Sequence, residues 1–83
     1  MSRHATITVH VAQMRVLTHV AVKDGAIDEA HLHAALVQRG LISPEVSAVH
    51  LNPYGENPYQ FNIIDADRHT SLGVLTIHAG AGA

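Results

Sequence analysis

Apolar and polar side chains alternate through residues 5–22, the first clear pattern in the chain. In residues 6–12 every second side chain is Ile or Val, and a second alternating run extends from Met14 to Val22. A period of two predicts strands that are buried on one side. We expect two strands joined by a turn at Gln13–Met14, although both residues are weak turn formers. One long bent strand, which would favour an intertwined dimer, is the alternative.

A helix is predicted from Asp28 to about Arg39. Asp28 is a favourable N-cap residue, and Glu29 adds a negative charge where the helix dipole favours one. At the other end, Gly40 and Leu41 fit the Schellman motif that terminates many helices. Apolar residues at helical spacing supply the buried stripe, which comprises Ile27, Leu32, Ala35 and Leu36.

The second half of the chain predicts three further strands separated by a loop and a turn. Residues 52–59 contain Asn-Pro-Tyr twice, and each proline disfavours helix at the residue before it, so we expect a loop there. Residues 65–69 are polar and predict a turn, whereas the small residues of 79–83 predict a flexible tail. The strands themselves are expected at residues 48–51, 59–64 and 72–79.

This order of elements predicts an α+β fold in which residues 1–83 form one small domain. The order β-β-α-β-β-β gives a mixed sheet of about 4–5 strands packed on one helix. In that arrangement the helix covers one face of the sheet, and the last strand can lie parallel to the first.

Three segments of the chain resemble the β-grasp, or ubiquitin-like, family. TITVHV to RVLTHVAV is similar to the family's opening hairpin, GLISPE to the end of its helix, and TSLGVLTIHAGAGA to its last strand and tail. The resemblance implies a β-grasp-like fold. Two features depart from it: the tail ends in Gly82–Ala83 instead of Gly-Gly, and residues 52–65 are longer than the family's equivalent. Conjugation through the C-terminus is therefore not expected.

Charged residues are scarce, at 14% of the chain, whereas apolar residues reach 47%. Ordinary domains are about 25% charged, so the surface is either unusually neutral or partly covered by a partner. The net charge of −2 argues against nucleic acid as a partner. The chain lacks cysteine and any apolar run long enough to span a bilayer. We therefore expect no disulfide and no membrane partner, and we expect a cytoplasmic location.

Histidine is abundant, with eight residues whose protonation would reverse the sign of the net charge. The simpler interpretation is that these histidines serve as polar, aromatic residues of the surface. His31 and His33 lie about 200° apart around a helix and cannot share a metal ion there. Asp65, Asp67 and His69 share one face if that segment is extended, so a His/Asp metal or small-ligand site is the alternative function. No nucleophile motif or phosphate-binding loop is present. The sequence therefore predicts neither an enzyme nor a cofactor.

The outward-facing Thr and His side chains of the first strand are the candidate binding surface, and Thr76 and His78 can extend it. Such a surface can lose its water without burying unpaired ions. The simpler alternative is an exposed strand face that happens to contain Thr and His. Tyrosine is enriched at binding hot spots, but one of the two tyrosines also fits the core face of a strand. The candidate protein-binding residues are His4, Thr6, Thr8, His10, Tyr54, Tyr59 and His78.

These observations predict a non-catalytic protein–protein interaction domain. It would act as a small assembly subunit, or as a phage or mobile-element type of inhibitor of a larger protein complex. The expected partner is another protein. A homodimer through a strand edge or through the Thr/His face is a further alternative.

Overall fold

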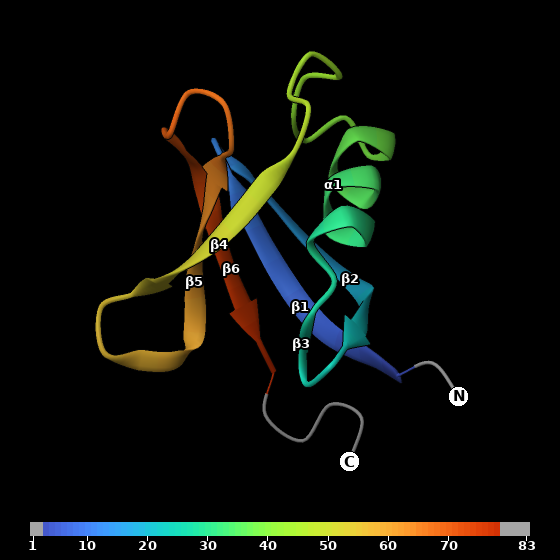
Figure 1. Ribbon diagram of the computed structural model, residues 1–83, viewed down its shortest axis with the longest axis vertical. Helices are drawn as coiled ribbons and strands as arrows, with labels where there is room; N and C mark the ends of the chain where they lie inside the picture. Colours follow the sequence, from blue (N-terminus) through green and yellow to red (C-terminus); the bar gives the residue numbers. More distant parts are fainter. Residues whose placement is uncertain (1–2, 79–83) are drawn as a thin grey trace.

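The computed structural model describes residues 3–78, which form one antiparallel sheet and one helix (Figure 1). Strands hold 56% of these residues and the helix 13%. The order across the sheet is β3-β2-β1-β6-β5-β4. The sheet curls into a half-barrel, and the core lies on its concave side. The flexible tail expected at residues 79–83 lies outside the described residues.

The first two strands, β1 (Arg3–Val11) and β2 (Met14–Lys23), pair along their whole length as a hairpin. This excludes the single long strand. The turn is Ala12–Gln13, one residue earlier than expected, and Ala12 has a φ of 54°. Two-residue hairpin turns need such a left-handed residue, which costs an L-amino acid about 1–2 kcal/mol. A two-residue strand that the sequence did not predict, β3 (Ala26–Ile27), pairs with the end of β2.

The helix, α1 (Glu29–Gln38), begins and ends as the sequence predicts. The Asp28 carboxylate accepts hydrogen bonds from two backbone N–H groups of the first turn. At the other end, Gly40 has a φ of 72°, and the Leu41 N–H donates to the Leu36 carbonyl at 2.9 Å. These are the features of a Schellman ending. The N-cap residue and the Schellman residues were therefore sufficient to predict both ends of the helix.

The helix bridges two separated strands of the sheet, β2 and β4 (Val49–Tyr54). The Glu29 carboxylate accepts a hydrogen bond from the Leu51 N–H in β4 at 2.8 Å. His31 accepts one through Nδ1 from the Ala21 N–H in β2 at 2.7 Å. Side chains from one turn of helix thus satisfy backbone donors on both sides of the half-barrel.

The last three strands form a meander in which β4 pairs with β5 (Asn57–Asp65), and β5 pairs with β6 (Ser71–Ile77). Most of the loop expected at residues 52–59 is strand, and a turn at Gly55–Glu56 separates its two Asn-Pro-Tyr repeats. Pro53 fits in β4 because an edge strand does not need every N–H group for its ladder.

The fold class predicted from the sequence is wrong. β1 and β6 pair in antiparallel, with Ile7 opposite Ile77 and Val9 opposite Leu75, whereas the β-grasp arrangement needs a parallel pair. The sheet has six strands, all antiparallel, instead of a mixed set of 4–5 strands. The direction of β4 after the helix decides how β6 meets β1. Two hairpins connect β4 to β6, so β6 runs in the same direction as β4, and that direction is opposite to β1. Alternation of side chains carries no information about that direction.

A close approach between β1 and β6 shapes the core. A Cβ atom added to Gly73 would lie 2.8 Å from Val11 Cγ2 and against the carbonyl oxygen of His10. Val11 therefore occupies the inward space that a side chain at position 73 would need. The largest fully buried side chains of the core are Ile7, Val9, Val20, Leu32, Leu36, Ile63 and Leu75.

Ala12→Gly should raise the free energy of unfolding by about 0.5–1 kcal/mol, because glycine adopts the required φ without strain. Urea denaturation measures the change. The control is Ala34→Gly on the exposed side of α1, which should lower the same quantity by about 1 kcal/mol. Changes of the same sign at both positions would contradict the strain assigned to Ala12.

Gly73→Ala should lower the free energy of unfolding by about 1–3 kcal/mol, because the added methyl group overpacks the contact between β1 and β6. Ser71→Ala, at the exposed start of β6, should change it by less than about 0.5 kcal/mol. Thermal melts of both variants provide the comparison. An unchanged melting temperature for Gly73→Ala would show that the space between β1 and β6 accommodates a methyl group, which would contradict the prediction.

Candidate functional site

Outward-facing side chains of neighbouring strands form a continuous surface, called here the outer face. At its centre Thr8 lies opposite Leu17 on one side and Thr76 on the other, and Thr76 lies opposite Gln60. One row of side chains therefore crosses four strands. The outer face comprises His4, Thr6, Thr8, His10, Arg15, Leu17, His19, Tyr54, Gln60, Asn62, Val74, Thr76 and His78.

The structure brings the Thr and His candidates of the first strand together with His78. His4, His10 and His78 are exposed, whereas Thr6 and Thr8 are half-buried. The backbone N–H of His78 donates to the Thr6 carbonyl at 3.0 Å, and its ring Nε2 forms a hydrogen bond with the Thr8 hydroxyl. The geometry expected from the alternating pattern is therefore present. Binding of a protein by these residues stays a prediction.

The two candidate tyrosines lie on different sides of the sheet. Tyr54 lines a shallow polar hollow of about 350 Å³ in the outer face, together with His10 and Arg15. Tyr59 lines a separate, apolar hollow with Phe61, whose side chain packs against the core. Tyr54 therefore belongs to the outer face and Tyr59 does not, whereas binding of a protein by either tyrosine stays a prediction.

Leu17 is the residue of this surface that the sequence interpretation missed. Its side chain is 62% exposed and lies between Arg15 and His19 along β2. An aliphatic residue on the polar side of an alternating strand was the available signal. The basic groups of the outer face are Arg15 and its four histidines, and no carboxylate belongs to it.

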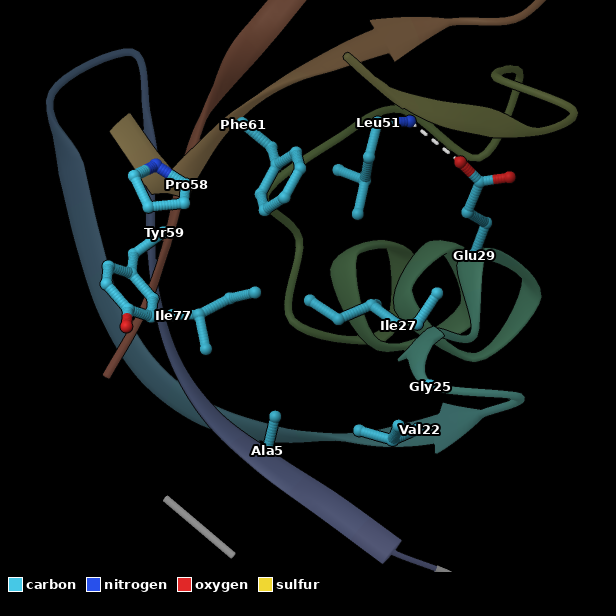
Figure 2. Close-up of a pocket in the computed structure, with 11 residues that line it drawn as sticks. Ala5, Val22, Gly25, Ile27, Glu29, Leu51, Pro58, Tyr59, Phe61 and Ile77 are labelled. Carbon is cyan, nitrogen blue, oxygen red and sulfur yellow. Dashed lines mark hydrogen bonds between the residues drawn. The ribbon is translucent and has the colours of Figure 1, made fainter. Parts of the chain in front are cut away.

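An apolar hollow of about 620 Å³ opens on the concave side of the sheet (Figure 2). Strands at both ends of the sheet order and the start of α1 contribute to its wall. Glu29 is the ionisable carboxylate in the wall, and its hydrogen bond to Leu51 is drawn in Figure 2. Residues distant in sequence meet there, so no local pattern predicted the hollow. Its lining consists of Ala5, Val22, Gly25, Ala26, Ile27, Glu29, Leu51, Pro58, Tyr59, Phe61 and Ile77.

The alternative metal-binding segment at residues 65–69 forms the turn between β5 and β6. The buried Asp65 carboxylate accepts hydrogen bonds from the N–H groups of Asp67 at 2.9 Å and Arg68 at 3.1 Å. The Asp67 carboxylate accepts one from the Ser47 hydroxyl at 2.6 Å. Within residues 3–78, no group of three or more His, Asp or Glu side chains is arranged to hold a metal ion.

The helical histidines have structural partners as well. His31 accepts the N–H of Ala21, and His33 Nε2 forms a hydrogen bond with the Val46 carbonyl. The first contact ties α1 to β2, and the second ties it to the segment before β4. Both rings therefore anchor the helix.

Comparison with known protein families, curated proteins and solved structures finds no match to this chain. In the part of the chain that the structure describes, no helix is long and apolar enough to cross a membrane. Interpretation of the outer face and of the hollow therefore rests on their own residues.

Asp65 makes the stability of the β5–β6 turn sensitive to acid. The backbone N–H group of Arg68 is the main cause that lowers the pKa of this carboxyl below its ordinary value of 3.8, and the N–H group of Asp67 lowers it further. A lowered folded-state pKa gives stability that is complete above about pH 5 and is lost as the pH falls through that pKa. Asp65→Asn should therefore destabilise the protein at pH 7 and flatten the acid limb of its stability curve. The control, Asp24→Asn at an exposed turn, should leave that limb unchanged in acid-titrated urea denaturation.

Proposed function

We propose that this chain is a non-catalytic protein-interaction domain that binds a protein partner through the outer face. The observation that supports the proposal is a charge-poor surface across four strands, with the exposed Leu17 at the β2 end of its central row. Arg15 is its permanently charged side chain, and its remaining polar groups are hydroxyls, amides and imidazoles. A partner can therefore displace water from this surface without burying unpaired ions.

The two edges of the sheet differ in how open they are to a partner strand. On β4, Glu29 already accepts the Leu51 N–H, and Pro53, whose nitrogen points the same way, has no N–H to offer. At the opposite edge, β3 pairs only with Val22 and Lys23, so within residues 3–78 the rest of β2 has no neighbouring strand on that side. Added strands need a row of free backbone groups. The outer face and the β2 edge that borders it therefore form one region open to a protein partner.

In this proposal the domain is an assembly subunit or a small inhibitor that covers part of a larger protein complex, and it acts in the cytoplasm. A cysteine-free chain is compatible with that compartment. A second copy of the chain would place Arg15 and the histidines opposite the same groups. A different protein, with a flat surface that includes carboxylates near Arg15, fits the outer face better.

The proposal is tested with Leu17→Glu, which places a carboxylate on the outer face, opposite Thr8. Proteins retained by the immobilised wild-type chain are identified first, and the dissociation constant of each is then measured with wild type and variant. Leu17→Glu should weaken the relevant complex by at least about tenfold, or about 1.4 kcal/mol, because the new charge must lose its water.

The matched control is Ala34→Glu, at an exposed position of α1. It should leave the dissociation constant within about twofold of wild type, since surface substitutions away from contacts have small effects. Sedimentation of the purified chain with and without Leu17→Glu tests the homodimer. The proposal is refuted if wild type and Leu17→Glu bind every partner with equal affinity, or if the wild-type chain retains no partner.

A further inference from the structure

We propose that the apolar hollow on the concave side of the sheet binds a small molecule whose buried part is uncharged and apolar, such as an acyl chain or an aromatic ring system. The outer face and the hollow lie on opposite sides of the sheet. A protein partner and a small ligand could therefore be bound at the same time, and either activity can exist without the other.

The walls of the hollow come from every strand of the sheet and from α1. Ala5 and Ile77 are contributed by the central strands, whereas Ile27 and Leu51 come from opposite edges. Figure 2 shows these four side chains around a common open space. Walls from several strands distinguish this half-open hollow from a flat apolar patch, and its volume of about 620 Å³ lies within the range of small-molecule sites.

The chemistry of the wall selects an uncharged occupant. The two oxygens of Glu29 are directed to other groups, with Oε2 2.8 Å from the Leu51 N and Oε1 3.5 Å from His50 Nδ1. The hydroxyl of Tyr59 points away from the centre of the open space in Figure 2. The remaining lining side chains are apolar. Water inside the hollow has few groups to bond, so an apolar molecule displaces it favourably.

Incomplete burial of core-facing side chains supports the same conclusion. Val22, Ile27, Leu51, Phe61 and Ile77 pack against the core but stay only partly buried, and all five line the hollow. An apolar occupant would complete their burial and extend the core. A single side chain from a partner would leave most of a space of about 620 Å³ unfilled. A separate small molecule is therefore the better fit.

N-phenyl-1-naphthylamine tests the proposal, because it is uncharged at neutral pH and fluoresces strongly in apolar surroundings. Titration into the full chain should show saturable binding of one probe per chain, with a dissociation constant below about 100 µM. Decanol should displace the probe. Ala5→Phe, which adds a ring directed into the hollow, should weaken probe binding by at least about tenfold.

Three variants complete the design. Ile27→Trp fills the hollow from a different strand and should also weaken binding, which keeps the test valid if far-UV circular dichroism shows that Ala5→Phe is unfolded. Ala34→Phe makes the same substitution as the first variant on the exposed side of α1 and should bind the probe like wild type. Leu17→Glu should also keep wild-type affinity, since it changes the outer face alone.

Absence of saturable binding to the wild-type chain would overturn the proposal. Wild-type affinity in folded Ala5→Phe and Ile27→Trp would do the same, because the probe would then occupy another surface. Sedimentation that shows a dimer dissociated by Ala5→Phe would identify a second copy of the chain as the occupant and would also reject a small ligand.

Discussion

Antiparallel pairing between β1 and β6 is the contact on which the rest of the structure depends. It joins the N-terminal unit β1-β2-β3 to the C-terminal meander β4-β5-β6. The same four residue pairs, from Ile7–Ile77 to His10–Val74, align the inward side chains of the core and the outward row that contains Thr8 and Thr76. Gly73 permits this contact, because the backbone of β1 and the side chain of Val11 occupy the place of its missing Cβ.

The helix completes what this pairing begins. The half-barrel leaves backbone donors unpaired on β2 and β4, and α1 satisfies one on each through His31 and Glu29. Closure by α1 leaves the hollow accessible beside the first turn of the helix, where Glu29 forms part of the wall (Figure 2). The position of α1 that satisfies these backbone donors therefore also leaves an apolar space beside the core. Two candidate binding surfaces, on opposite sides of one thin sheet, follow from a single topology.

Local features of this protein could be predicted from its sequence, and long-range ones could not. Asp28 and Gly40 mark the ends of α1 through hydrogen bonds with nearby residues, so the predicted helix was right. The period of two placed Thr8 and His10 on the outside of β1 for the same reason. The direction of β4 depends on how α1 meets two separate strands, which no sequence period records.

The candidate site divides in the same way. Residues of the outer face follow from alternation and strand order, except that Leu17 resembled an ordinary strand residue until its exposure was known. Tyr59 was grouped with Tyr54 because both follow Asn-Pro, but they lie on different strands, β5 and β4, and face opposite sides of the sheet. The hollow requires Ala5, Leu51 and Ile77 to meet, and this depends on the complete sheet.

The union of β1 with β6 also has a consequence for biosynthesis. β6 is the last of the described strands to be translated, whereas β1 is the first. The hairpin of β1 and β2 and the capped helix are local and can form early, but the second edge of β1 stays unpaired until residues 74–77 have been made. During that interval a nearly uncharged strand edge is open to other chains. The order of synthesis thus makes the nascent protein more dependent on rapid completion, or on chaperones, than its small size suggests.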